Sequence, residues 1–484
     1  MGRKITIEPV TRVEGHGKVT IQLDDSNNVS QSRLHVVEFR GFEKFAQGRP
    51  YWEAPVMVQR LCGICPVSHH LAAVKAMDVI VGAGTGDGLT PTGEKMRRLM
   101  HYGQFFQSHA LHFFHLASPD LLFGADGDPA IRNVIGVALE HKDLAVQGVM
   151  MRKFGQEIIQ ATAGKKVHGT GAIPGGINKN LSAAERDSFL KGADPLNIDK
   201  MVSWAQGAID FFKGYYAKNK DFIDNFAVFP SAHLSLVRKK DGALDLYHGV
   251  LRAVDSEGKR ILNDVDCQDY AKVIAEEVKN WSYMKFPYLR SLGKEKGWYT
   301  VGPLARLNVC EFIPTPLAQK EFEAYKALTN GKPNHMSMHM HYARLIELLH
   351  AGEVIRDLLK DPDLQKDNLV KKGKKQSEGV GIVEAPRGTL FHHYRINDKD
   401  QISMANLIVS TTNNNEPMNR AVNFVAKSAF NGKKEITEGM MNRVEMAIRA
   451  YDPCLSCATH ALGQMPLEIT LVDSNGAVLD TRRK

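Results

Sequence analysis

The sequence has few cysteines and no long run of apolar residues. Six cysteines in 484 residues are too few to stabilise a chain of this length as a disulfide scaffold. No apolar run approaches the roughly 20 residues that a membrane-spanning helix requires, and the first residues lack the apolar core of a secretory signal. The sequence therefore argues against a disulfide-rich secreted protein, and we expect no membrane span.

Basic and glycine-rich stretches are too sparse to indicate a nucleic-acid or nucleotide site. Lys and Arg total 62 and Asp and Glu total 54, which gives a net charge of +8. The densest basic cluster, at 371–375, contains no aromatic residue, so a solvated loop is favoured over a nucleic-acid surface. The glycine-rich stretch at 82–88 follows a helical pattern rather than a strand. We therefore expect no nucleic-acid partner and place no NAD site on this chain.

The sequence does contain the periodicity of a large, mainly helical core. Hydrophobic residues make up 43% and charged residues 24%, as in ordinary globular proteins. Apolar residues at helical spacing predict a long buried helix over 97–116. Further predicted helices cover 138–160, 200–217, 317–328, 338–360 and 436–450. Predicted strands cover 4–10, 17–23, 33–39, two parts of 394–410, and a hairpin over 467–480. We predict an α+β fold, predominantly α-helical, with small peripheral β-hairpins and no dividing linker.

Two C-x-x-C pairs are the strongest chemical signal. They are C-G-I-C at 62–65 and C-L-S-C at 454–457, and the other two cysteines, Cys267 and Cys310, are isolated. Each pair places two thiolates within reach of one ion, so the pairs together can form a four-sulfur site that ties the two ends of the chain. Structural zinc is one interpretation and a redox-active soft metal is the other. A thioredoxin-like site is disfavoured because neither pair follows a βαβ pattern.

The residues around the two pairs resemble the large subunit of nickel–iron hydrogenases. The first pair lies in R-L-C-G-I-C-P-V-S-H and the second in D-P-C-L-S-C-A-T-H. The resemblance extends to R-V-E-G-H at 12–16, R-G-F-E at 40–43, the segment 164–176 and E-A-P-R-G at 384–388, and so covers essentially the whole chain. The local sequence is most similar to the NAD-reducing, bidirectional subgroup. The resemblance implies the large-subunit fold with a core of long helices, a single catalytic domain over 1–460, and reversible heterolytic cleavage of hydrogen.

The resemblance also implies a set of metal ligands. All four paired cysteines, Cys62, Cys65, Cys454 and Cys457, would bind nickel. The second of each pair would also bridge to an iron that carries carbon monoxide and cyanide. Soft thiolates suit nickel, so this assignment is chemically coherent. Glu43 and His460 match the ligands of a buried magnesium ion. Because Mg²⁺ prefers oxygen ligands, the magnesium assignment rests on the resemblance alone.

Four residues are implied to act directly in the reaction. When hydrogen splits, the thiolate of Cys454 would accept the proton and Glu14 would take it onward. A carboxylate suits that task when its pKa lies near the working pH. Arg387 would place its fixed guanidinium charge beside the metals, and Asp452, just before the second pair, would brace it.

Three more residues are implied to support the metals. His69 would donate a hydrogen bond to a cysteine sulfur. Thr411, or Ser410 beside it, would meet a cyanide ligand, and the resemblance leaves both alternatives open. One departure is Ser108, which stands where the family commonly has an aspartate. The helix that follows carries histidines at 109, 112 and 115, and we expect these to be packed, hydrogen-bonded core residues rather than ligands.

Residues 461–484 match the C-terminal extension that a dedicated protease removes from such large subunits just after the final histidine. While the extension is attached, the second cysteine pair would stay open for nickel and iron insertion factors. We therefore expect the sequence to be a precursor. The alternative is an ordinary C-terminal β-hairpin that stays in place.

Electrons must leave this chain through another polypeptide. Two isolated cysteines cannot supply the four ligands of an iron–sulfur cluster. The resemblance implies an iron–sulfur small subunit and diaphorase-type subunits whose flavin and iron–sulfur clusters lead to NAD+, in the cytoplasm. The alternatives are the same nickel–iron chemistry with NADP or a deazaflavin as acceptor, a hydrogen sensor, and a zinc-stapled structural subunit of a redox complex.

Overall fold

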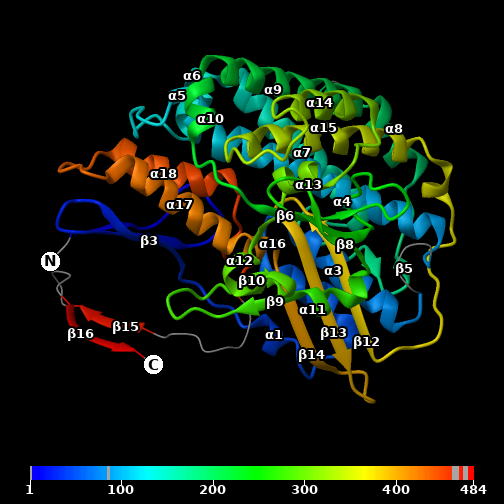
Figure 1. Ribbon diagram of the computed structural model, residues 1–484. Coiled ribbons are helices and arrows are strands. Elements are labelled where there is room, and N and C mark those ends of the chain that lie inside the picture. The colour runs from blue at the N-terminus through cyan, green and yellow to red at the C-terminus, as the bar shows by residue number, and fades with distance from the viewer. Residues whose placement is uncertain (1–2, 84–87, 194, 460–467, 473–477, 484) are drawn as a thin grey trace.

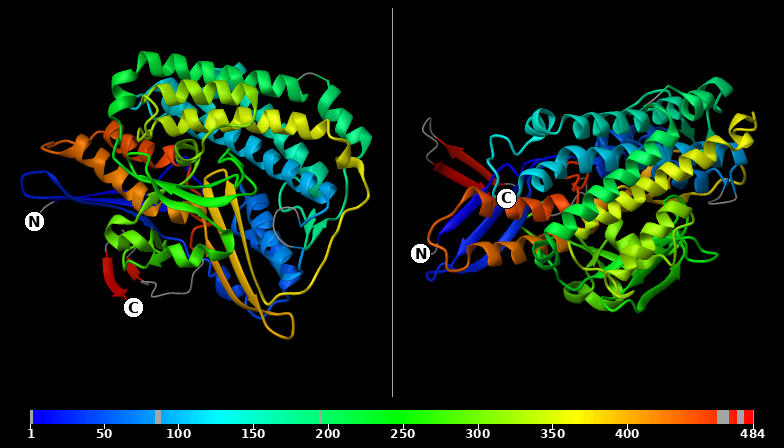
Figure 2. Two further views of the ribbon diagram at one scale, coloured as in Figure 1. Left: turned by 45° about the vertical axis from the view of Figure 1, so that its right-hand side comes forward. Right: turned by 90° about the horizontal axis from the view of Figure 1, so that it is seen from above.

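The computed structural model describes residues 3–83, 88–193, 195–459, 468–472 and 478–483 (Figure 1). Four long helices form its core: α4 (Pro91–Leu111), α7 (Lys142–Ala163), α9 (Ile198–Lys218) and α15 (His339–Leu359). Helix α4 packs against both α7 and α15, and α15 packs against α9. Figure 2 shows these helices bundled together on one side of the molecule. No helix of the described residues is long and apolar enough to cross a membrane.

The predicted long helix is α4, although it ends earlier than expected. It begins after Thr90, whose hydroxyl accepts a hydrogen bond from the N–H of Gly93. It ends at Leu111, where the chain widens into a π-helical turn, His112–Ala117. The other five predicted helices are found as α7, α9, α14, α15 and α18. The remaining helices are α1 (Phe42–Phe45), α2 (Ala54–Met57), α3 (Pro66–Ile80), α5 (Ser118–Phe123), α6 (Val134–Glu140), α8 (Ala183–Lys191), α10 (Lys220–Asn225), α11 (Tyr270–Val273), α12 (Gly293–Lys296), α13 (Pro303–Val309), α14 (Pro316–Ala327), α16 (Ser410–Asn413), α17 (Asn415–Phe430) and α18 (Glu438–Ala450).

The strands of the described residues form three sheets of three or four strands and three two-stranded pairs, β4-β5, β9-β10 and β15-β16. The predicted N-terminal strands form an antiparallel sheet, β1-β2-β3, and β3 packs against α17. The strands predicted within 394–410 belong to a second antiparallel sheet, β12-β13-β14. A third sheet, in the order β11-β6-β7-β8, was not predicted. The strands are β1 (Lys4–Ile7), β2 (Gly17–Leu23), β3 (Val29–Val36), β4 (Ala172–Ile173), β5 (Gly176–Ile177), β6 (Ala232–Val237), β7 (Val250–Val254), β8 (Arg260–Val265), β9 (Ile274–Glu277), β10 (Phe286–Leu289), β11 (Tyr299–Thr300), β12 (Glu378–Ala385), β13 (Gly388–Ile396), β14 (Ile402–Ile408), β15 (Glu468–Val472) and β16 (Val478–Arg483).

The sheet β12-β13-β14 is central rather than peripheral, because helix α3 packs directly on strand β12. Two glycines make this close approach possible. A Cβ atom on Gly381 would lie 2.0 Å from the carbonyl oxygen of Ala72, and one on Gly379 would lie 2.2 Å from that of Ala76. This packing brings Cys65, which directly precedes α3, beside the β12–β13 turn.

Replacing Gly381 with alanine is expected to destabilise the protein by about 1–3 kcal/mol, because the added methyl group must push helix α3 away from the sheet. Chemical denaturation measures this change. Gly207→Ala on α9 is the control. A Cβ atom there meets nothing within 4 Å, so we expect it to raise stability by about 1 kcal/mol. Equal effects of the two substitutions would contradict the packing argument.

Candidate metal centre

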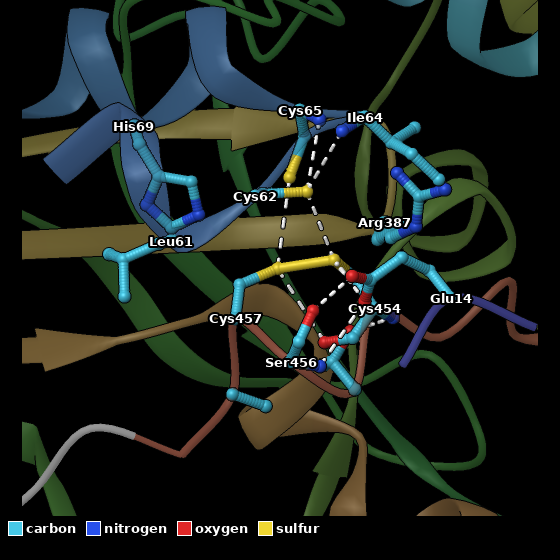
Figure 3. Close-up of a disulfide and its surroundings, with 12 residues drawn as sticks. Glu14, Leu61, Cys62, Ile64, Cys65, His69, Arg387, Cys454, Ser456 and Cys457 are labelled. Atoms are coloured by element: carbon cyan, nitrogen blue, oxygen red, sulfur yellow. Dashed lines mark hydrogen bonds between the residues drawn. A yellow bond between two sulfur atoms is a disulfide. The ribbon is translucent and has the colours of Figure 1, made fainter. Parts of the chain in front are cut away.

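The four paired cysteines meet at one buried point (Figure 3). All four Sγ atoms lie within 4.8 Å of one another. The Sγ atoms of Cys62 and Cys454 are 3.1 Å apart, and those of Cys65 and Cys457 are 3.9 Å apart. Cys454 and Cys457 are joined as a disulfide, so both must be reduced to thiolates before they can bind a metal ion. The first pair comes from the start of α3 and the second from the loop after α18.

The surroundings of the first pair favour a thiolate at Cys62. The N–H groups of Ile64 and Cys65 donate hydrogen bonds to its Sγ, at 3.2 and 3.1 Å. Burial alone raises the pKa of the Cys62 thiol, but hydrogen bonding from Cys65 and the charge of Arg387 outweigh burial and lower the pKa. Four converging sulfurs with such support fit a soft metal ion.

A small cavity adjoins the sulfurs and has both apolar and polar walls. Its apolar walls are Ala385, Pro386, Leu390 and Val409, and its polar walls are His69, Arg387, Ser410 and Thr411. The buried Nε of Arg387 has no hydrogen-bond partner among the described residues. An apolar cleft with a few donors suits small ligands of a second metal ion, so the residues present fit a two-metal centre as well as a single ion.

Arg387 lies at the tip of the β12–β13 hairpin, facing the cysteines. Its Nη2 donates to Oδ1 of Asp452 at 3.0 Å, and its Nη1 donates to the hydroxyl of Ser108 at 3.3 Å. Burial lowers the pKa of Arg387, but the charges of Asp452 and the cysteines outweigh burial and raise the pKa. The guanidinium charge is therefore permanent at this position. Ser108 occupies the place of the missing carboxylate as a neutral hydrogen-bond partner.

The hydrogen bonds of Ser410 and Thr411 distinguish the two alternatives that the sequence left open. The hydroxyl of Ser410 donates to the carbonyl oxygen of Gly388 at 2.7 Å, so its hydrogen is already used. The hydroxyl oxygen of Thr411 accepts from the N–H of Cys454 at 2.9 Å, which leaves its hydrogen for another acceptor. Thr411 is therefore the better donor into the cavity.

Glu14 contacts the second cysteine pair directly. Its Oε2 lies 3.0 Å from Sγ of Cys454 and accepts the N–H of Ser456 at 3.2 Å. The hydroxyl of Ser456 donates to Oε1 of Glu14. The backbone carbonyl of Glu14 also accepts the N–H of Leu455 at 2.9 Å. The predicted pair of Glu14 and Cys454 is thus brought together, and Ser456 holds the carboxylate from the other side.

The remaining predicted residues are placed as follows. His69 lines the cavity and shares a hydrogen bond with His392 at 3.1 Å, while its predicted bond to a cysteine sulfur stays a prediction. Glu43 accepts the N–H of Leu407 at 2.8 Å. His460 lies outside the described residues. His109 is buried and hydrogen-bonded to Glu347 at 2.9 Å, as expected for a core histidine.

Sequence reasoning missed the residue that holds the Arg387 turn in place. Arg306 is fully buried on α13, where its Nε and Nη2 donate to Glu347 at 2.6 and 2.7 Å. Its Nη1 donates to Glu384 at 2.8 Å and to the carbonyl oxygen of Ala385 at 2.9 Å, and its Nη2 reaches the carbonyl oxygen of Pro386 at 3.1 Å. Arg306 therefore anchors the backbone of the β12–β13 turn through the carbonyl oxygens of Ala385 and Pro386. No local motif could reveal it, because its partners are far away in the sequence.

Comparison with protein families decides the identity of the chain. Residues 40–123 and 245–460 match the family model described as nickel-dependent hydrogenase, and residues 4–39 match a model described as HoxL-like. This chain belongs to the nickel-dependent hydrogenase family. It is therefore an oxidoreductase, and the fold class and enzyme class expected from the sequence are confirmed.

Two relatives show how closely this hydrogenase follows its family. The chain is 53% identical to the NAD-reducing hydrogenase HoxS subunit beta of Cupriavidus necator, over the full length of both proteins. A solved NAD+-reducing NiFe-hydrogenase in its hydrogen-reduced state is 52% identical. It superposes with a TM-score of 0.91 over 95% of this chain and 99% of that one.

Proposed function

We propose that this hydrogenase chain cleaves hydrogen reversibly and heterolytically at a nickel–iron centre, and that its electrons pass through partner subunits to NAD+. The observation that carries the proposal is the meeting of two C-x-x-C pairs in one four-sulfur cluster with Glu14 in contact with Cys454. Both relatives are described as NAD-reducing hydrogenases, which supports NAD+ as the acceptor. NADP or a deazaflavin is thereby disfavoured, as are the roles of hydrogen sensor and zinc-stapled structural subunit.

Cys62, Cys65, Cys454 and Cys457 would hold nickel, and Cys65 and Cys457 would also hold iron with its carbon monoxide and cyanide ligands. When bound, this centre supplies the open metal position at which hydrogen is polarised. The small cavity beside Cys65 and Cys457 is consistent with room for the iron ligands, and Thr411, whose hydroxyl oxygen accepts the N–H of Cys454, would donate a hydrogen bond to one of them. The permanent charge of Arg387 would stabilise negative charge that develops beside the metals.

The proton would leave through this chain's own side chains. The thiolate of Cys454 accepts it, and Glu14, 3.0 Å away, takes it onward. The hydrogen bonds from Ser456 keep the carboxylate turned toward the sulfur. Glu43 and His460 would bind magnesium, and the burial of the Glu43 carboxylate supports this assignment.

The partners of this chain would be an iron–sulfur small subunit and diaphorase-type subunits that carry flavin and iron–sulfur clusters, in the cytoplasm. Purification of the native complex, followed by an assay of hydrogen-dependent reduction of NAD+, tests this. NADP+, a deazaflavin and a viologen dye serve as parallel acceptors. We expect NAD+ and the dye to be reduced. Reduction of the dye alone would support hydrogen cleavage at the metal centre and contradict NAD+ as the acceptor.

We further propose that residues 461–484 are an extension that a protease removes after nickel and iron insertion factors have loaded the site. The second cysteine pair lies just before this segment, and its closure over the metals would follow cleavage. Intact mass of the nickel-containing protein provides the measurement. We expect a chain that ends at His460. A nickel-loaded, active chain that still ends at Lys484 would refute the proposal.

A further inference from the structure

A buried carboxylate outside the metal centre joins two arginines from opposite ends of the chain. Asp120 on α5 accepts hydrogen bonds from both Nη atoms of Arg12, at 3.0 and 2.5 Å. It also accepts one from Nη1 of Arg449, at 2.9 Å. The side chains of Asp120 and Arg449 are almost fully buried, and that of Arg12 is 13% exposed. We call these three residues the Asp120 clamp. Burial raises the pKa of Asp120, but the charges of Arg449 and Arg12 outweigh burial and lower the pKa.

The two arginines of the Asp120 clamp lie close in sequence to the proposed proton-transfer pair, Glu14 and Cys454. Arg12 is two residues before Glu14, and Arg449 is five residues before Cys454. A second set of bonds reinforces the link, because Arg449 donates to the carbonyl oxygen and hydroxyl of Thr11 at 3.0 and 2.9 Å. The N-terminal segment is therefore hydrogen-bonded to the end of α18, at the point where both segments turn toward the four cysteines.

Both segments contain a backbone conformation that needs support. Arg12 has a φ of 55° and Asp452 a φ of 53°, in the left-handed region that residues other than glycine rarely adopt. Such conformations cost free energy and persist only where the surrounding structure holds them. Beyond these residues Glu14 and Cys454 lie side by side, with the N–H of Leu455 donating to the carbonyl oxygen of Glu14 at 2.9 Å.

We propose that Asp120 is a positioning residue that sets the distance between Glu14 and Cys454, and through it the rate at which the proton leaves the site. This inference rests on the proposed function. Asp120 contacts neither residue of the pair and acts through Arg12 and Arg449. Without its charge, Arg12 and Arg449 lose the carboxylate that they share, Arg449 keeps only Glu445 as a carboxylate partner, and the two segments can separate. Because proton transfer requires hydrogen-bond distance, a displacement near 1 Å can lower its rate about 100-fold.

Asp120→Asn tests the inference, with Asp78→Asn as a matched control. Asp78 is also buried and accepts two hydrogen bonds from one arginine, Arg97, at 2.6 and 3.1 Å, but it lies on α3 and joins neither segment. Two rates are compared in the loaded enzyme. Conversion between ortho- and para-hydrogen needs only splitting and reformation of the bond, whereas isotope exchange with heavy water also needs the proton to leave. We expect Asp120→Asn to lower the ratio of exchange to conversion about 10- to 100-fold, and Asp78→Asn to leave it unchanged.

A measurement on the metal-free protein gives a second, independent readout. Amide hydrogen–deuterium exchange of the peptide around Leu455 reports the bond between its N–H and the carbonyl oxygen of Glu14. We expect Asp120→Asn to accelerate this exchange and Asp78→Asn not to. An unchanged ratio and unchanged amide exchange in Asp120→Asn would overturn the inference, as would equal changes in the control.

If Asp120→Asn fails to accumulate as folded protein, Arg12→Lys and Arg449→Lys replace it, since each keeps the charge but loses the planar fork. Unchanged ratios and unchanged Leu455 amide exchange in both lysine variants would equally overturn the inference. A wild-type enzyme that converts no ortho- to para-hydrogen would refute the proposed function instead. In that case the amide measurement, which needs no metal, still decides whether the clamp holds the two segments together.

Discussion

Replacing any one of Cys62, Cys65, Cys454 or Cys457 with serine is expected to abolish nickel retention and hydrogen turnover. All four sulfurs lie within 4.8 Å of one another, so each can offer one ligand atom to the same metal ion. A serine hydroxyl is a hard ligand that stays protonated at neutral pH, and it cannot replace a thiolate on a soft metal ion. Elemental analysis of the purified variants measures nickel per chain, and a viologen assay measures turnover.

The two cysteines outside the cluster provide matched controls. Cys310 is buried at the end of α13, and the half-buried Cys267 donates to the carbonyl oxygen of Gly249 at 3.4 Å. Neither Sγ belongs to the cluster. We expect Cys267→Ser and Cys310→Ser to retain nickel and turnover. Full nickel occupancy in any variant of the four clustered cysteines would show that the cluster is not the nickel site.

The parts of this fold that could be predicted are those with a local period. The long helices carry apolar residues at helical spacing over many turns, so α4, α7 and α15 were expected near their true positions. Strands β7 and β8 carry no such signal. Every residue of β7 is buried and those of β8 are all at least partly exposed, so neither strand alternates between buried and exposed residues. Their sheet depends on tertiary contacts that no sequence window contains.

The residues of the candidate site likewise divide into those that a local motif predicts and those that depend on long-range contacts. The cysteine pairs, Glu14 and Arg387 lie in short motifs and were found from them. Arg306 and Ser456 were not found, because their contacts join distant segments. Arg306 reaches partners 41 and 78 residues away, and Ser456 supports Glu14 across 442 positions. Only the folded chain reveals whether Ser410 or Thr411 has a hydroxyl hydrogen available to donate into the cavity.

Replacing Glu14 with glutamine is expected to lower hydrogen oxidation about 10²- to 10⁴-fold while nickel content stays unchanged. Glutamine has nearly the same shape, and its single carbonyl oxygen can keep one of the two hydrogen bonds that Ser456 donates to the carboxylate oxygens. Its amide group cannot take up a proton at neutral pH, so the path from Cys454 is interrupted at its first step. Glu14 contacts Cys454 but is not one of the four converging sulfur ligands, which is why the metal content should remain.

The two isotope measurements separate this loss from damage to the metal centre. Conversion of para-hydrogen should persist in Glu14→Gln, because under the proposed function splitting would need only the metal centre and the Cys454 sulfur, whereas exchange with heavy water should fall with turnover. Ser456→Ala offers a graded comparison. It removes one hydrogen bond to the carboxylate but leaves the N–H of Ser456 and the 3.0 Å contact of Glu14 with Cys454. We therefore expect a loss of about 10-fold or less, since one hydrogen bond contributes about 1 kcal/mol. Heavy-water exchange in Glu14→Gln within about threefold of wild type, well short of the loss expected from removing an acid–base group, would mean that the proton leaves Cys454 through another group.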